Sequence, residues 1–167
     1  ATVILVHGLF RSAMEVEPIA EVFRELGCEV LLLNLRNHGG SEARPEANRA
    51  GRSAALARWG LIPSWVKDAS KFPLLINARA ETAATKNSFR AAMTYRRCLI
   101  PANVWYEWRK DGTAKHKNRI TLPDHQPFLF AGLENGREAT IITCAPSPAI
   151  AHIHNRMPAI IGPNHIA

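Results

Sequence analysis

The chain reads Trp-Gly-Leu-Ile-Pro-Ser-Trp at positions 59–65 and Phe-Pro-Leu-Leu-Ile-Asn-Ala-Arg-Ala-Glu-Thr at positions 72–82, and these two stretches decide the fold. The apolar run that opens the second stretch is typical of a strand, and Asn77, Arg79 and Glu81 follow where that strand should end. Polar side chains at the end of a strand commonly face a cleft rather than bulk water. The sequence therefore predicts a functional site at this point.

Further strands and one helix are predicted around this stretch. Short apolar runs typical of buried strands occur at 74–77, 98–100, 128–132 and 140–143. Asp111-Gly112 follows an aromatic run and indicates a hairpin turn. The segment 83–97 is rich in Ala, Lys, Arg and Met and predicts a helix. The predicted fold class is strand-rich α+β.

The first 42 residues have a different pattern. A strand pattern, a helix pattern and a second strand pattern follow one another at 2–6, 13–26 and 30–35, which predicts a short β-α-β unit. With His-Gly after the first strand and Arg-Asn-His-Gly-Gly-Ser after the second, this segment resembles the start of an α/β-hydrolase. The nucleophile motif of that family, Gly-x-Ser-x-Gly, is absent from the chain. His7 and His38 are therefore interpreted as turn residues, and an esterase-like hydrolase is the least favoured function.

Composition changes along the chain. Residues 1–50 carry 5 Lys/Arg and 7 Asp/Glu, whereas residues 51–167 carry 16 and 7. Residues 43–57 have no strong period and contain Pro45 and Gly51, which indicates a junction. The predicted organisation is a truncated hydrolase-like segment at 1–42, a junction at 43–57, and a domain at 58–167 that is truncated at both ends.

Charge and cysteine usage limit the function classes. The surplus of nine positive charges in residues 51–167 suits a protein that binds a polyanion such as nucleic acid, although many basic domains bind none. Cys28, Cys98 and Cys144 are far apart and form no Cys-x-x-Cys pair, so neither a metal nor another cofactor is expected, and a reducing compartment is. No apolar run approaches the roughly 18 residues of a membrane span. A cytoplasmic protein, associated with the nucleoid when bound to DNA, is expected.

Six strings in the second part resemble the SRAP family, the SOS-response-associated peptidases, over about residues 58–162. They are Arg-Trp-Gly-Leu-Ile-Pro-Ser-Trp (58–65), Ile-Asn-Ala-Arg-Ala-Glu-Thr (76–82), Arg-Cys-Leu-Ile-Pro-Ala-Asn (97–103), Tyr-Glu-Trp (106–108), Ile-Ile-Thr (141–143) and Ile-His-Asn-Arg-Met-Pro (153–158). The resemblance implies a protein that senses abasic sites in single-stranded DNA. It also implies an autopeptidase that exposes an N-terminal Cys, and a thiazolidine cross-link between that Cys and the abasic sugar.

The resemblance assigns three catalytic residues. Glu107 takes the proton-transfer role, and its aromatic neighbours give it an apolar setting that can raise its pKa. Asn77 holds the amine and sugar oxygens through its amide. His154 serves ring opening and reversal of the cross-link.

The resemblance also assigns four DNA contacts. Trp65 stacks on a base beside the lesion, Arg79 and Arg156 contact phosphates, and Thr143 donates a hydrogen bond at the site. Single-stranded DNA, especially at abasic sites, is the partner that follows.

The family's nucleophile is an N-terminal Cys followed by Gly-Arg, whereas residue 1 is Ala. The three internal cysteines have their nitrogen in an amide bond and cannot close a thiazolidine ring. We therefore expect cross-linking to be impaired in this chain, and a second hypothesis is a non-catalytic protein that binds single-stranded DNA.

Structural alternatives remain open for individual residues. Trp65 could pack in the core, and Asn77 and His154 could be structural polar groups. Glu81 could form a surface ion pair with Arg79 that contributes little. The basic segment 110–119 could be a solvated loop or could track a phosphate backbone.

Overall fold

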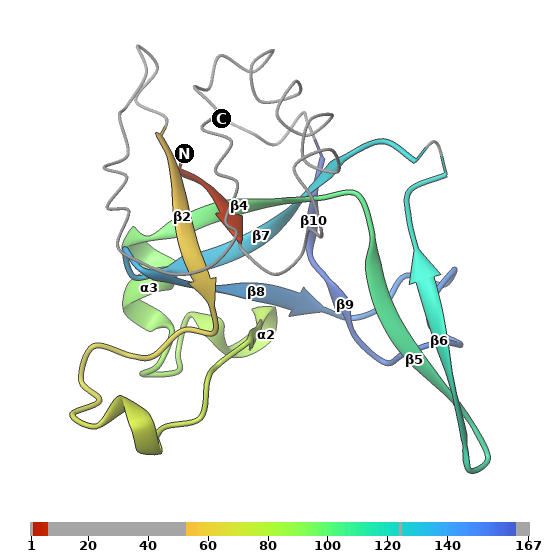
Figure 1. The fold of residues 1–167 in the computed structure, drawn as a ribbon, viewed down its shortest axis with the longest axis horizontal. Helices are drawn as coiled ribbons and strands as arrows, with labels where there is room; N and C mark the ends of the chain where they lie inside the picture. The colour runs from red at the N-terminus through yellow and green to blue at the C-terminus, as the bar shows by residue number, and fades with distance from the viewer. Residues whose placement is uncertain (1, 7–52, 124, 163–167) are drawn as a thin grey trace, which may run out of the picture.

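The computed structural model describes residues 2–6, 53–123 and 125–162 (Figure 1). The elements are, in chain order, β1 (Thr2–Val6), β2 (Ser53–Trp59), η2 (Ala69–Lys71), β3 (Asn77–Arg79), α2 (Ala80–Ala83), α3 (Arg90–Tyr95), β4 (Arg97–Ala102), β5 (Trp105–Asp111), β6 (Ala114–Ile120), β7 (Phe128–Glu134), β8 (Glu138–Cys144), β9 (Met157–Pro158) and β10 (Ile160–Ile161). Strands dominate and the helices are short, which confirms the strand-rich α+β prediction. Within these residues, no helix is both long and apolar enough to cross a membrane.

Five strands of the main sheet close into a ring. Strand β7 pairs antiparallel with β4 on one side and with β8 on the other. Strand β1 pairs parallel with β4 and β2, and β2 in turn pairs parallel with β8. The order β7, β4, β1, β2, β8 therefore returns to β7, a barrel-like closure that removes the free edges of these strands. Strand β3 pairs with the later part of β8 and forms an outer branch.

The strands β7 and β8 are buried on both faces. Phe130 and Ile141 belong to one core cluster, whereas Leu133 and Ile142 belong to a second one. Because successive side chains of a strand point to opposite faces, each strand contributes to both clusters. This explains why both strands read as continuous apolar runs. Burial of each large apolar side chain contributes about 1.5–3 kcal/mol to stability relative to exposure.

The helix predicted over 83–97 is wrong in its extent. Helix α2 ends at Ala83 and α3 begins at Arg90, with turns between them. The connecting segment contains Thr85, whose hydroxyl donates to the carbonyl of Thr82, followed by Asn87 and Ser88. Such side chains compete with the helical hydrogen bonds of the backbone, which is why the helix does not continue.

The strand predicted around residues 72–77 is also displaced. Strand β3 consists of Asn77–Arg79, so these polar residues lie within the strand rather than after it. Of the preceding apolar run only Leu75 makes a bridge, to Leu61, and Leu74 and Ile76 are exposed. Pro73, which has no amide hydrogen to donate, is the second residue of that run.

The strand predicted at 2–6 is confirmed as β1. Residues 53–57 belong to β2, although their pattern indicated a junction. The helix and second strand predicted for the hydrolase-like segment, together with His7 and His38, lie outside the described residues. The division into 1–42, 43–57 and 58–167 stays a prediction.

Strands β5 and β6 form a separate two-stranded sheet that projects from the main body (Figure 1). Asp111 pairs with Ala114 at its end, and Gly112 in the turn has a φ of 58°, in the left-handed region that favours glycine. The hairpin turn predicted from Asp111-Gly112 is confirmed.

Candidate active site

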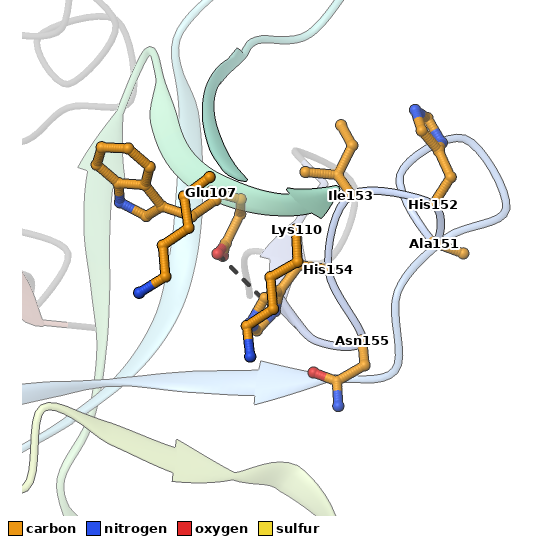
Figure 2. Close-up of a pocket in the computed structure, with 9 residues that line it drawn as sticks. Glu107, Lys110, Ala151, His152, Ile153, His154 and Asn155 are labelled. Atoms are coloured by element: carbon orange, nitrogen blue, oxygen red, sulfur yellow. Dashed lines mark ion pairs between the residues drawn. The ribbon is translucent and has the colours of Figure 1, made fainter. Parts of the chain in front are cut away.

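A groove lies between the β5–β6 hairpin and the segment 151–155 (Figure 2). Its volume is about 860 Å³. The residues that line it are Glu107, Trp108, Lys110 and Lys115 from the hairpin, and Ala151, His152, Ile153, His154 and Asn155 from the facing segment. Charged and imidazole groups therefore meet in one solvent-accessible hollow.

The hairpin side of the groove is anchored by Trp105. Its ring is buried and makes edge-to-face contacts with Phe128 at 5.6 Å and Phe130 at 6.1 Å between ring centroids. Because side chains alternate along a strand, Glu107 lies on the same face of β5 as this anchor. The anchored strand thereby holds Glu107 at the inner end of the hairpin.

The facing segment is held by a turn and by two apolar side chains. Ile150 is buried in the core, and Ile153 packs against the same cluster. The backbone amides of Ile153 and His154 both donate to the carbonyl of Ile150, at 2.8 and 3.2 Å. This turn presents the His154 side chain to the groove.

Glu107 and His154 form the chemical centre of the groove. Figure 2 shows the carboxylate pointing toward the imidazole, and Glu107 Oε2 lies 3.8 Å from His154 Nδ1. Burial raises the pKa of Glu107, and the nearby His154 partly offsets that rise. A carboxyl that holds its proton more tightly than usual, next to an imidazole, is an arrangement suited to general acid–base chemistry.

A backbone contact orients the imidazole. The amide N–H of Arg156 lies 3.2 Å from His154 Nδ1 and donates to it in the tautomer that carries the ring proton on Nε2. The carbonyl oxygen of Arg156 lies 3.1 Å from the same nitrogen. When the ring is doubly protonated, Nδ1–H can instead donate to this carbonyl or to the Glu107 carboxylate. The ring is therefore held in place in both protonation states.

The side chain of Arg156 is engaged by its neighbours. Its guanidinium donates to both carboxylate oxygens of Glu81, at 2.8 and 2.9 Å, and to the carbonyl of Thr143 at 2.6 Å. The hydrogen bonds from Arg156 lower the pKa of Glu81 to about 2. Glu81 thus pairs with Arg156, not in the surface pair with Arg79 that the sequence left open. The two hydrogen bonds between Arg156 and Glu81 connect helix α2 to the segment that carries His154.

Other predicted site residues lie on β3 and β8. Asn77 and Arg79 are exposed on β3, and Arg79 lies opposite Thr143 in the parallel pairing. The buried hydroxyl of Thr143 donates to the carbonyl of Ala78 at 3.4 Å and lies 3.3 Å from the Arg156 guanidinium. None of Asn77, Arg79 and Thr143 lines the groove. The structure therefore brings together Glu107 and His154. The backbone of Arg156 contacts His154, and the side chain of Arg156 contacts Thr143.

Trp65 lies apart from the groove. Its side chain is 57% exposed and contacts Phe72 edge to face at 5.7 Å, so it is not a core residue. Together with Asn87, Arg90 and Ala91 it lines a second hollow of about 420 Å³.

Sequence reasoning missed three residues of this region. Lys110 and Lys115 were interpreted only as part of a basic segment, and Glu81 only as a surface residue. The hairpin signal could have placed the two lysines opposite each other, since a short turn at Asp111-Gly112 pairs them across the strands. Among the described residues no cluster of three or more His, Cys, Asp or Glu could hold a metal ion.

Comparison with known proteins places the chain among relatives. The family model described as SOS response associated peptidase (SRAP) matches residues 17–167. The chain is 41% identical over 128 residues to the abasic site processing protein YoaM of Bacillus subtilis, a match that covers 71% of this chain and 55% of YoaM. It is 36% identical over 113 residues to the abasic site processing protein YedK of Escherichia coli, covering 63% and 49%. The chain thus spans about half the length of the curated relatives it matches.

Solved structures show the same likeness. A crystal structure of a Bacteroides thetaiotaomicron protein superimposes with a TM-score of 0.60 at 29% identity, covering 72% of this chain and 59% of that one. A Bordetella bronchiseptica protein gives a TM-score of 0.58 at 29% identity, covering 66% and 62%.

Proposed function

This chain belongs to the SRAP family of SOS response associated peptidases, and from that premise we propose that it recognises abasic sites in DNA at the groove that contains Glu107 and His154. The observation that carries the proposal is the contact of 3.8 Å between a carboxyl of raised pKa and an imidazole. Abasic site processing is the activity printed in the names of several relatives.

The groove suits the chemistry of an abasic sugar. In its open-chain form this sugar presents an aldehyde, and an amine that adds to the aldehyde carbon gives a carbinolamine. Loss of the hydroxyl as water then gives an imine, and this step needs a proton donor. Because its pKa is raised, Glu107 holds a proton closer to neutral pH than an ordinary carboxyl does. His154 can pass protons to and from it.

The amine can come from more than one group. Lys110 and Lys115 line the same groove as Glu107, and the terminal amine is a further candidate. In the family resemblance, an N-terminal cysteine supplies both an amine and a thiol, and the thiol then adds to the imine carbon to close a thiazolidine. The same proton transfers by Glu107 serve the imine route and the thiazolidine route. Cross-linking to DNA and self-processing, which the family resemblance implies, are part of this proposal.

The remaining site residues take supporting roles in the proposal. Asn77 and Arg79 are exposed on β3 and free to contact the sugar and a phosphate. The exposed Trp65 offers a surface on which an unpaired base can stack, a contact worth about 1–3 kcal/mol per base in single-strand binders. Arg156 and Thr143 would act at the site through the position they give to His154, and Arg156 would reach a phosphate only by leaving Glu81.

Borohydride trapping tests the proposal. The chain of residues 1–167 is incubated with single-stranded DNA that contains one aldehydic abasic site, with and without borohydride. We expect an adduct that borohydride traps and that Glu107→Gln greatly reduces. Asp111→Asn, which removes the other carboxylate of the hairpin, should leave the adduct in place. An adduct that is stable without borohydride would show that a second nucleophile has captured the imine.

A second candidate is a non-catalytic protein that binds single-stranded DNA. The observation that favours it is the pair of half-exposed aromatic side chains, Tyr106 and Trp108, on the basic hairpin. In this case DNA binding is retained in the trapping experiment and no adduct forms in either condition. No preference for abasic over undamaged DNA in binding would contradict the first proposal.

A further inference from the structure

The two faces of the β5–β6 hairpin differ in charge. Residues paired across the strands of an antiparallel ribbon share a face. One face, here called the cationic face, carries the pairs Tyr106–Arg119, Trp108–Lys117 and Lys110–Lys115. The opposite face carries the pairs Glu107–Asn118, Arg109–His116 and Asp111–Ala114. Both carboxylates of the hairpin thus lie on the face opposite to these four cations.

The cationic face is open to solvent. Trp108 is 53% exposed and Tyr106 is 49% exposed, and the four cations are exposed as well. Within the residues that the structure describes, none of these cations takes part in an ion pair. Lys117 Nζ lies 4.2 Å from the centre of the Tyr106 ring, a cation–π contact that holds this lysine on the face. Among the described residues, no carboxylate therefore neutralises the charges of this face.

The face is continuous with the groove. Lys110 and Lys115 belong to the cationic face and also line the groove that contains Glu107. The successive pairs are separated by two residues, or about 7 Å along the strand. This repeat is comparable with the spacing of phosphates along an extended nucleic acid strand, and the Trp108 ring offers a flat surface for a base.

We propose that the cationic face of the hairpin binds the phosphate backbone of the single DNA strand that continues out of the groove. This inference rests on the proposed function, because it takes the groove as the place where the lesion lies. The proposal adds a second contact region on the protein. This region does not distinguish between sequences or between damaged and undamaged DNA, because the phosphates are the same in both.

The proposal is tested with single-stranded oligonucleotides of two lengths. Each contains a tetrahydrofuran abasic analogue, which has no aldehyde, so only binding is measured. The short oligonucleotide spans the groove alone, and the long one extends well beyond it on both sides. Affinities are measured over a series of salt concentrations for the wild type and for the triple variant Lys115→Gln, Lys117→Gln, Arg119→Gln.

We expect the wild type to bind the long oligonucleotide more tightly than the short one. Its affinity for the long oligonucleotide should also fall more steeply as salt is added. Each phosphate contact in a single strand contributes about 0.7 to the slope of log K against log salt, so the triple variant should lose about 2 from that slope. Between 50 and 200 mM salt this corresponds to a difference on the order of tenfold in affinity. In the double variant Lys117→Gln, Arg119→Gln, which keeps the groove residue Lys115, the ratio of affinities for abasic and undamaged DNA should stay the same.

A charge-matched control separates the hairpin from net charge. The control triple variant Lys86→Gln, Arg97→Gln, Arg137→Gln removes three exposed cations that do not lie on the hairpin, and it should keep the length-dependent slope. An equal loss in both variants would overturn the proposal, as would a wild type that binds both lengths equally well. A lesion preference that falls in the double variant Lys117→Gln, Arg119→Gln would also overturn it. In each of these cases, the proposed function of the groove is still supported if the wild type binds the short abasic oligonucleotide. If the wild type does not bind it, the proposed function itself is contradicted.

Discussion

Glu107 binds its proton more tightly in the folded chain than in the unfolded one, because burial raises its pKa. Between its unfolded and folded pKa values, the folded chain holds a proton that the unfolded chain has released. The associated stability is present at low pH and is lost as the pH rises through this window. At neutral pH the ionised carboxylate therefore lowers stability, as expected of a group kept for chemistry rather than for folding.

Glu107→Gln should consequently stabilise the protein in a pH-dependent way. Glutamine has nearly the shape of the protonated carboxyl and never ionises, so the variant should unfold at a higher temperature than the wild type at about pH 8. The expected gain is up to about 0.5 kcal/mol. At about pH 4 and below the two proteins should melt together. Thermal unfolding, followed by circular dichroism, measures the melting temperatures of the two proteins at the two pH values. An equal gain at both pH values would contradict a raised pKa of Glu107.

Glu81 behaves in the opposite way. The hydrogen bonds from Arg156 lower its pKa from 4.5 to about 2, so its contribution to stability is present above the unfolded pKa and is lost as the pH falls toward 2. Because Arg156 also holds His154, Glu81→Gln should slow borohydride-trapped adduct formation, on the order of tenfold. Binding to the tetrahydrofuran oligonucleotide should not weaken.

Asp68→Asn is the matched control for Glu81. The hydrogen bond from the Ser70 hydroxyl, with help from Lys71, likewise lowers the pKa of this exposed carboxylate. Its removal should reduce stability at neutral pH and leave the trapping rate untouched. If both variants slowed trapping equally, Glu81 would have no specific role in placing His154.

Single residues were predicted unevenly from sequence. Glu107 and His154 were recognisable through short strings, and the structure places them within ion-pair distance. The partnership of Glu81 and Arg156 was not recognisable, because 75 positions separate them and only the tertiary fold brings them together. The roles of Asn77 and Arg79 at the site stay predictions.

The hairpin is the element on which the site depends most. Trp105 packs into the core at its base, whereas Trp108, three positions later on the same strand, points to solvent. The alternation of a strand gives the two tryptophans opposite environments. The first packs the base of the hairpin against the core, and the second leaves its ring exposed to solvent.

Trp105→Ala should destabilise the protein by about 3–5 kcal/mol, because it leaves a cavity between Phe128 and Phe130. Trp108→Ala, which removes an equal volume from an exposed position, should change stability by no more than about 0.5 kcal/mol. Urea unfolding compares the two. Similar losses would show that Trp105 does not anchor the hairpin.

Elements with strong local signals were predicted well. The hairpin followed from Asp111-Gly112, and β7 and β8 followed from continuous apolar runs. The helix over 83–97 was overextended, because its composition favours helix while Asn87 and Ser88 favour a turn. Strand β2 was missed because Ser-Ala-Ala-Leu-Ala-Arg-Trp contains no β-branched residue and becomes a strand through its partners β1 and β8.

At the scale of the whole molecule, the ring of five strands decides which groups solvent can reach. Cys98 lies in β4 between β1 and β7, and burial raises its pKa to about 12. Gly132 on β7 lies opposite it, where an added Cβ would come within 2.8 Å of the sulfur. Close packing between these strands therefore keeps the Cys98 thiol away from solvent.

Cysteine labelling should therefore report on the ring. Cys98 should react with a thiol reagent only as fast as the protein unfolds globally, whereas the partly exposed Cys144 should react in the native state. Mass spectrometry of the labelled peptides distinguishes the two sites as urea is increased. Labelling of Cys98 at low urea, before the circular dichroism signal changes, would show that the ring opens locally.

The ring also has a consequence for synthesis. Thr2 in β1 lies opposite Cys98 in β4, so β1 cannot complete its pairing until almost a hundred further residues have been translated. At 5–20 residues per second this takes roughly 5–20 s. The sequence Thr-Val-Ile-Leu-Val has the composition of an aggregation-prone strand. A nascent chain with this topology therefore benefits from a chaperone that covers β1 or from a low local concentration of identical chains.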